Sequence, residues 1–211
     1  WLQAQGAQLS LGRRAGALAR DGDGWRCDDW LGDAVIVATS SGEALRLLAP
    51  HAPAWTTAAQ RLRPEAIATV YLQAAGARLV APMVALAGGP AQFLFDLGAL
   101  GGEPGRFAAV ASAVASELDD GLEPLARRIE TQVSAQVPAL ASATRLRAHA
   151  DRRATFACLA GVERPAMQVA PRLAVAGDYT ESPYPATLEG AVRAGLAAAE
   201  SLHPATMRSK S

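Results

Sequence analysis

The sequence is poor in the residues that build metal centres and disulfide frameworks. Cys27 and Cys158 are its only cysteines, and neither belongs to a CxxC or Cys/His spacing. The pattern favours neither a zinc site nor a disulfide, so we expect two reduced thiols in a cytoplasmic protein. His51, His149 and His203 are scattered without a catalytic partner at a recognisable spacing. We therefore predict no metal site and no histidine with a direct chemical role.

The sequence also has no excess of positive or negative charge. Twenty basic and twenty acidic residues give a formal net charge of zero, and no run of Lys or Arg forms a stripe. Nucleic acid is therefore not expected as a partner. No apolar stretch reaches about 18 residues, and no basic, apolar and small-residue pattern opens the chain. We expect neither a spanning helix nor a secretory peptide, although a lipid substrate could be met at a membrane surface, peripheral to the inner membrane.

Familiar catalytic motifs are absent as well. The glycines of residues 98–105 lie between two strand candidates and no GKS or GKT follows, so the pattern favours a hairpin loop over a phosphate loop. Ser40 and Ser41 lack the GxSxG pattern of a hydrolase nucleophile. No catalytic residue is predicted. If the protein is an enzyme, we expect a bound cofactor to perform the chemistry while the protein supplies position and electrostatics.

What the sequence does contain is a large apolar fraction and two α/β patterns far apart. The chain has 211 residues and half of them are hydrophobic, enough to bury a sizeable core in one large or two small domains. An Asp-Gly-Asp-Gly turn predicts a hairpin near the start, and a β-branched run followed by a helix predicts a βα unit. The expected elements are strands at 8–11, 15–20, 25–27 and 33–38, and a helix at 43–48 capped by Ser40 or Ser41.

The middle of the chain has the pattern of an antiparallel sheet with one helix. Signals weaken between residues 50 and 64, where we place a domain crossing. Short apolar segments separated by Gly- and Pro-rich turns then predict strands at 66–73, 82–87, 92–97, 107–113, 144–149 and 154–157. Residues 118–137 are predicted to be helical, closed by Pro138, with an apolar stripe of Leu122, Leu125, Ala126, Ile129 and Val133.

The final pattern is a strand, a turn and a helix over residues 173–200. The apolar run 173–176 stops at Gly177-Asp178, and the helix after it should pack through Leu188, Ala191, Val192, Gly195, Leu196 and Ala199. Pro185 suits a first helical turn, whose N–H groups and dipole favour an anionic or electron-rich group. Asp178 could accept hydrogen bonds from ligand hydroxyls beside it. An alternative is that Asp178 only caps its own turn.

Together these patterns predict an α/β (α+β) protein. Residues 1–50 and 165–203 would share one parallel sheet, residues 51–164 would form an inserted antiparallel-sheet domain, and residues 204–211 would be a tail. The two α/β pieces must then meet in space although they are far apart in sequence.

The C-terminal motif resembles that of a known family. Gly177-Asp178-Tyr179-Thr180 and residues 184–192 (YPATLEGAV) closely resemble the C-terminal FAD-binding motif of the flavin amine oxidase and phytoene desaturase superfamily. Within it they are most similar to squalene-associated FAD-dependent desaturases of hopanoid biosynthesis, also called hydroxysqualene dehydroxylases. Supporting segments, in order, are 33–38, 67–72, 90–96 and 153–156.

The resemblance implies an incomplete FAD/NAD(P)-binding Rossmann-like domain with an inserted substrate domain. Such proteins open with a strand–GxGxxG–helix unit for the ADP part of FAD, and this sequence contains none. The chain thus looks like a C-terminal half, and the missing N-terminal half of the same enzyme becomes an expected partner. Alone, we expect it to hold FAD weakly or not at all, and to be inactive.

The resemblance also implies site residues and an activity. Asp178 would contact the ribityl or pyrophosphate part of FAD, and N–H groups near Thr187 to Glu189 would face the flavin pyrimidine edge. Leu188 and Val192 would serve mainly in packing. The expected cofactor-binding residues are Gly177, Asp178, Tyr184, Pro185, Thr187, Leu188 and Glu189.

The implied reaction is the reductive removal of an allylic hydroxyl from hydroxysqualene to give squalene. The inserted domain would form an apolar cavity for this long isoprenoid, since residues 67–72 and 92–97 carry few charges. Alternatives are a carotenoid-type desaturase or a flavin amine oxidase of the same fold. A further alternative, from another class, is a non-catalytic lipid-binding or interaction module.

Overall fold

The computed structural model describes residues 1–202 and divides into two compact units. The terminal unit comprises Trp1–Leu62 and the chain from Ala160 onward, and the inserted unit is Arg63–Leu159. The sequence placed the crossings after residues 50 and 164. Helix α2, Pro53–Gln60, instead belongs to the terminal unit because it packs against α1, Ser41–Leu48. The predicted tail at 204–211 and His203 lie outside the described residues.

The terminal unit is built on a small mixed sheet that joins distant parts of the chain. Strand β4, Val35–Val37, pairs in parallel with β11, Leu173–Val175, and β10, Gln168–Ala170, pairs antiparallel with β11. All three residues of β11 are buried, as expected for a parallel strand covered on both faces. The predicted sharing of one sheet by the two α/β pieces is confirmed.

A three-stranded antiparallel β-unit precedes β4. Strands β1, Leu18–Asp21, and β2, Gly24–Cys27, form the predicted hairpin, and Gly22 takes the positive φ that its tight turn requires. Strand β3, Trp30–Gly32, adds to β2 and was not predicted. The strand predicted at residues 8–11 is wrong. These residues are exposed and pair with no strand, and the only element before β1 is the 3₁₀ turn η1, Gln3–Gln5.

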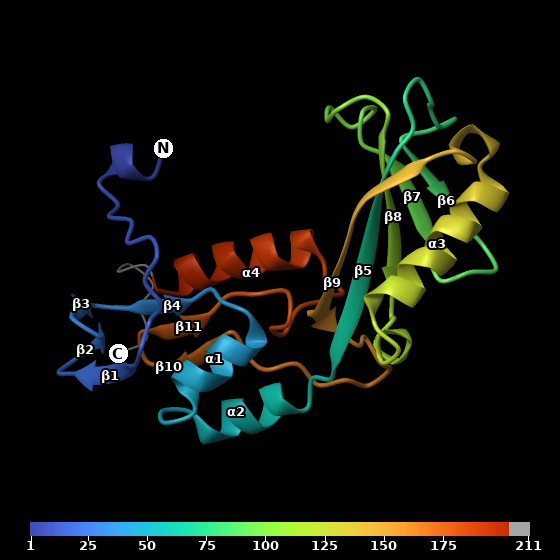
Figure 1. Cartoon of the computed structure of the whole chain (residues 1–211). Helices are drawn as coiled ribbons and strands as arrows, with labels where there is room; N and C mark the ends of the chain where they lie inside the picture. Colours follow the sequence, from blue (N-terminus) through green and yellow to red (C-terminus); the bar gives the residue numbers. More distant parts are fainter. Residues whose placement is uncertain (203–211) are drawn as a thin grey trace. The chain divides into compact units, whose positions relative to one another are not determined.

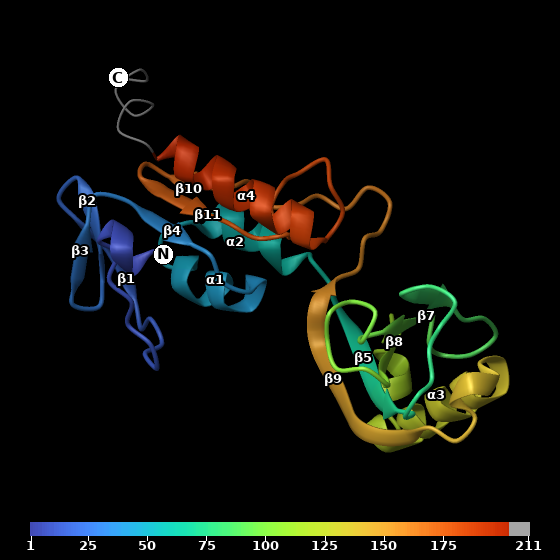
Figure 2. The same cartoon turned by 90° about the horizontal axis from the view of Figure 1, so that it is seen from above.

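Helix α4, Leu188–Ser201, lies along the β10–β11–β4 sheet (Figures 1 and 2) but turns a different face to it than the sequence predicts. Its buried residues are Gly190, Ala194 and Ala198, and Ala198 packs with Ala174 and Ala176. Small side chains let the helix backbone approach the sheet closely. The predicted stripe is therefore wrong: Leu188, Val192 and Leu196 are 89%, 58% and 61% exposed.

The inserted unit is a five-stranded antiparallel sheet, as predicted. The strands follow the order β6-β7-β8-β5-β9. Their bounds are Pro64–Gln73 for β5, Met83–Ala85 for β6, Phe93–Asp96 for β7, Arg106–Ser112 for β8 and Thr144–Phe156 for β9. The two pieces predicted at 144–149 and 154–157 are thus one strand of 13 residues. Two register shifts against β5 let it stay paired along its length.

Helix α3, Leu122–Gln136, covers one face of this sheet (Figure 1), flanked by the 3₁₀ turns η2, Ser116–Leu118, and η3, Pro138–Leu140. Leu125, Ala126, Ile129 and Val133 are buried against the sheet, which confirms the predicted stripe. Gln132 is also buried, and its amide satisfies both backbone groups of Ala91 at 2.9 and 2.8 Å. The helix therefore fixes the loop before β7 as well as the core.

Within residues 1–202, no helix combines the length and the apolarity needed to cross a bilayer. Cys27 and Cys158 are both free thiols.

An ion-pair cluster joins α3 to β9 and should make the inserted unit sensitive to acid. Glu123 receives hydrogen bonds from Arg145 at 2.7 Å and Arg127 at 3.0 Å, which lower its pKa to about 2. The lowered pKa means that ionised Glu123 stabilises the fold above pH about 4.5, and that this contribution is lost as pH falls towards 2. We predict that Glu123→Gln is less stable than the parent at pH 7 and matches it near pH 2, measured by urea unfolding. Equal stability at pH 7 would show that the exposed cluster contributes nothing.

Candidate functional site

The residues after β11 form a tight, tyrosine-braced turn. Tyr179 is 4% exposed, and its hydroxyl donates to the carbonyl of Thr39, just beyond β4, at 3.0 Å. Burial, with the neighbouring Asp178 charge, raises the pKa of this phenol, so it stays a donor. The ring lies over Gly177, where a Cβ atom would come 2.4 Å from Tyr179 Cε1. Gly177 is thus required by packing against Tyr179.

The same turn is closed by Thr180, which is fully buried. Its hydroxyl donates to the carbonyl of Gly177 at 2.9 Å. Next to it, the amide of Glu181 donates to the carbonyl of Pro165 at 2.9 Å. These bonds hold Asp178 at the carboxyl end of β11, next to that of the parallel strand β4. This edge is where open α/β sheets bind ligands.

Asp178 is partly buried and electrostatically unfavourable in its ionised form. Burial raises the pKa of its carboxyl, and the positive charge of Arg164 lowers it. A carboxylate held against a desolvation penalty is typical of a residue kept for binding rather than for stability.

Helix α4 begins later than the sequence suggests. Thr187 is its N-cap: the backbone there is extended (φ −144°, ψ 162°), and the hydroxyl accepts from the Gly190 amide at 3.1 Å and donates to the Pro185 carbonyl at 3.2 Å. Pro185 therefore lies two residues before the cap, and its predicted place in the first helical turn is wrong. Thr187 sets the start of the helix because its hydroxyl satisfies one of the free N–H groups of the first turn.

The first turn of α4 keeps two amides available. Gly190 is satisfied by the cap, but the N–H groups of Leu188 and Glu189 have no partner among the described residues, as helix geometry dictates. The side chains of these two residues point elsewhere. Leu188 is solvent-exposed, and Glu189 pairs with Arg193 at 2.6 Å. Leu188 and Glu189 can thus serve a ligand through the backbone, at the positive end of the helix.

Tyr184 lies on the approach to this turn. It is partly exposed, and the guanidinium of Arg193 stacks over its ring at 4.6 Å. All seven predicted residues lie between residues 177 and 189, in one continuous segment of the terminal unit. Asp178 and the amides of Leu188 and Glu189 are the groups in it that are suited to a ligand.

Arg164 is the site residue that sequence reasoning missed. Its guanidinium donates to the carbonyls of Asp178, Ser182 and Tyr184. The partners are backbone atoms 14 to 20 residues further along, and no side-chain pattern in the sequence marks them.

The inserted unit carries a second feature, the sheet face opposite α3, which we call the open face. Ala66, Ala68, Val70 and Leu72 of β5 point to α3, so the alternate residues Ile67, Thr69 and Tyr71 point away from it. Cross-strand partners extend this open face with Met83, Phe93, Phe95, Ala108 and Val110 on one side and Arg147, His149 and Asp151 on β9. Phe93 and Met83 are 41% and 49% exposed. The open face is therefore apolar over β6–β8 and charged along β9.

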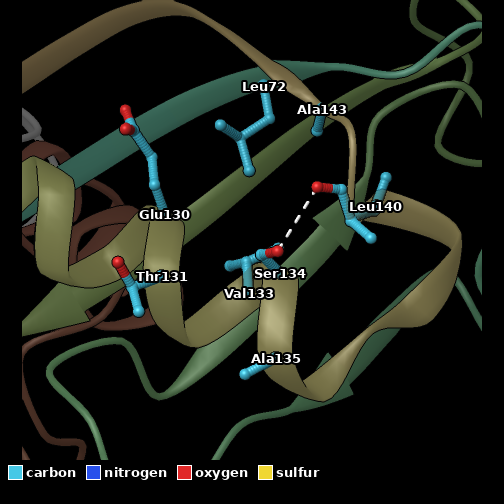
Figure 3. A pocket seen from close by; sticks show the side chains of 9 residues that line it. Leu72, Glu130, Thr131, Val133, Ser134, Ala135, Leu140 and Ala143 are labelled. Atoms are coloured by element: carbon cyan, nitrogen blue, oxygen red, sulfur yellow. Dashed lines mark hydrogen bonds between the residues drawn. The ribbon is translucent and has the colours of Figure 1, made fainter.

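A pocket of about 450 Å³ lies on the other side of this sheet (Figure 3). Leu72, Val133 and Leu140 line it together with Glu130 and Ser134, and the Ser134 hydroxyl donates to the Ala141 carbonyl at 3.3 Å. Because Leu72 points towards α3, the pocket is separate from the open face. It contains none of the predicted site residues.

The packing of Gly177 predicts a strong preference for glycine. Gly177→Ala places a methyl group against the Tyr179 ring and should destabilise the chain by about 1–3 kcal/mol. Gly195→Ala is the matched control, because a Cβ there meets no atom within 4 Å and alanine favours a helix interior by about 1 kcal/mol. Thermal unfolding of both variants tests this. A Gly177→Ala protein as stable as the parent would show that the turn can shift away from the ring.

The buried carboxyl predicts that Asp178→Asn stabilises the free chain. Since burial raises the folded-state pKa of Asp178, its ionisation favours the unfolded chain at neutral pH. The variant should unfold at higher denaturant concentration than the parent at pH 7, and the difference should shrink below pH about 4, where the parent carboxyl is protonated in both states. Lower stability of the variant at pH 7 would show that the ionised carboxylate is a structural cap, the alternative reading of this residue.

Comparison with known proteins gives a family match over this segment and a fold match over nearly the whole chain. Residues 144–203 match the model of the flavin containing amine oxidoreductase family. No curated protein sequence matches the chain. An oxidoreductase from Methanosarcina mazei superposes with a TM-score of 0.70 at 15% identity, over 94% of this chain and 51% of that one.

Two further solved structures have the same fold. A candidate protoporphyrinogen oxidase from Exiguobacterium sp. 255-15 matches with a TM-score of 0.59 at 15% identity, over 89% of this chain and 46% of that one. A protein from Pyrococcus furiosus matches with a TM-score of 0.58 at 16% identity, over 85% and 44%. The chain spans about half the length of the solved structures it matches. The family match is thus confined to residues 144–203, and the solved structures show the fold of nearly the whole chain.

Proposed function

We propose that the chain is the flavin-facing half of an FAD-dependent oxidoreductase that acts on a long isoprenoid. Its reaction is the reduction of hydroxysqualene to squalene. The observation that carries the flavin assignment is the site itself: Asp178 and the free amides of Leu188 and Glu189 lie in one segment at the carboxyl end of β11, inside the region that matches the flavin family.

The residues present fit the isoalloxazine and ribityl parts of FAD. A reduced flavin carries negative charge at its pyrimidine edge, which the two free amides and the positive end of α4 stabilise. The carboxylate of Asp178 suits a hydroxyl-rich ribityl chain, since it only accepts hydrogen bonds. When bound, the flavin supplies hydride; Asp178 and the first turn of α4 hold it in place.

The described residues contain no binding site for the ADP part of FAD. We propose that a second half of the enzyme, which carries the GxGxxG motif, provides this binding site. Two surfaces of the terminal unit suit that partner. Helix α4 exposes the apolar side chains of Leu188, Val192 and Leu196, and Ile36, which is 39% exposed, lies on the same sheet face as Ala174 beneath α4. Strand β4 also has a free edge, which an added parallel strand would cover.

The open face of the inserted unit supports an apolar substrate. Phe93 and Met83 are exposed on this face beside the half-buried Phe95 and Val110, and together these apolar side chains are a suitable contact for a long hydrocarbon. A long hydrocarbon of this kind partitions into lipid bilayers, so we propose that the protein also contacts a membrane surface.

The reaction balances as R–OH + FADH₂ → R–H + H₂O + FAD. A C–H bond would form in place of the allylic C–O bond, and the hydroxyl group would leave as water; the reduced flavin would supply both the hydride and the proton. The alternatives, a carotenoid-type desaturation or an amine oxidation, run in the opposite redox direction and would consume oxidised flavin.

The test is product analysis of the assembled enzyme. The chain is purified together with its GxGxxG-bearing half, loaded with FAD, reduced with dithionite and incubated with hydroxysqualene. We expect squalene by mass spectrometry, with loss of about tenfold or more in FAD affinity for Asp178→Asn, typical of removing a hydrogen bond to a charged group. Val110→Asp, on the open face, should reduce turnover while FAD affinity is retained.

Other outcomes separate the alternatives. The substrate assignment would be overturned if hydroxysqualene stays unchanged while the flavin-loaded protein oxidises an amine or desaturates phytoene. An assembled protein that binds lipid but no FAD would identify a non-catalytic module.

A further inference from the structure

We propose that Arg164 is a positioning residue for the flavin: its guanidinium sets the conformation of loop 177–184, so that Asp178 and the start of α4 are arranged before the ligand binds. The flavin as ligand rests on the proposed function. The effect on the loop does not, and it can be tested in the chain alone.

Three backbone carbonyls within seven residues converge on this one side chain. One terminal nitrogen, Nη1, donates to Ser182 at 3.2 Å and to Tyr184, and the other, Nη2, donates to Asp178. A guanidinium presents its donors in a fixed planar fork, so it can hold several carbonyls in one defined arrangement. An ammonium is a compact point charge and would hold fewer of them in fixed directions.

The neighbouring bonds make the loop dependent on this contact. Pro165, the next residue, accepts from the amide of Glu181, and the amide of Tyr184 donates to the hydroxyl of Ser182 at 3.1 Å. Residues 164–165 and 178–184 therefore form one hydrogen-bonded unit, and Tyr184 is followed within three residues by Thr187, the N-cap of α4.

The positive charge also has an electrostatic consequence. Carbonyl oxygens carry partial negative charge, and three of them near an anion-binding helix start would oppose an electron-rich flavin. Donation from Arg164 neutralises them, while its charge favours the ionised form of Asp178 against burial. One residue thus supports both the shape of the loop and its preference for the ligand.

The loop experiment uses amide hydrogen exchange on the 211-residue chain. In Arg164→Gln we expect the amides of Thr180, Glu181 and Tyr184 to exchange about tenfold faster, while those of β11 are unchanged. Arg61→Gln is the matched control. Arg61 lies in the same unit and pairs with Glu163 at 3.1 Å. The substitution Arg61→Gln therefore removes the same charge without removing a hydrogen bond to a loop carbonyl.

Two further readouts distinguish positioning from general support. In Arg164→Ala, ethylguanidinium should restore protection of the three amides, whereas ethylammonium should not. In the assembled FAD-bound protein, Arg164→Gln should weaken FAD binding by about tenfold or more, and Arg61→Gln should not change it.

The proposal is overturned if the three amides keep their protection in Arg164→Gln, if β11 loses protection to the same extent, or if the variant binds FAD as the parent does. If the parent assembly binds no FAD, the flavin function fails. Loss of loop protection with guanidinium rescue would then still establish the control of the loop by Arg164.

Discussion

The parallel pairing of β4 with β11 is the contact on which the rest of the terminal unit depends. It joins residues 35–37 to residues 173–175, and the ladder continues beyond the strands through the Ala176 amide, which donates to the carbonyl of Val37 at 3.0 Å. Tyr179 extends the same connection to Thr39. Without this pairing, the turn after β11 would have no fixed position, and neither Asp178 nor the start of α4 would be held in place.

The packing of α4 lowers the stability of this unit and leaves an apolar surface exposed. The helix meets the sheet through glycine and alanine, which brings its backbone close but buries little apolar area, while its leucines remain in water. Asp178 adds a desolvated charge, and the glycine at 177 is required by the tyrosine ring above it. These features reduce the stability of the isolated unit, and each of them is consistent with a surface completed by a partner and a ligand.

Several parts of the fold could be predicted from the sequence because the relevant signals are local. The Asp-Gly-Asp-Gly hairpin, the strands of the inserted sheet and the buried stripe of α3 follow from turn chemistry and periodicity. The face of α4 could not, since hydrophobicity favours Leu188 and Val192, whereas the sheet selects the small residues 190, 194 and 198 for close approach. The single strand β9 also escaped prediction, because charged residues on both of its faces interrupt the apolar pattern. Arg147 and Asp151 lie on the open face, and Arg145 pairs with Glu123 of α3.

The candidate site was predicted from a family motif, but the contacts of its residues required coordinates. Thr187 caps the helix, Tyr179 braces the turn, and Glu189 pairs with Arg193, so one carboxylate and two amides remain as the candidate groups for a ligand. Arg164 lay outside every pattern because its partners are carbonyl oxygens, which any residue supplies. Backbone contacts of this kind become visible only when the chain has folded.

We propose that this chain contains a preformed half of a flavin site. The most direct test is a nitrogen-15 NMR titration of the chain with millimolar FAD, which detects weak binding. We predict saturable shifts of the amides of Asp178, Leu188 and Glu189, with the α3 pocket and the β1–β3 unit unaffected. Absence of shifts in these three amides, or shifts confined to the inserted unit, would show that this segment is not part of a flavin site.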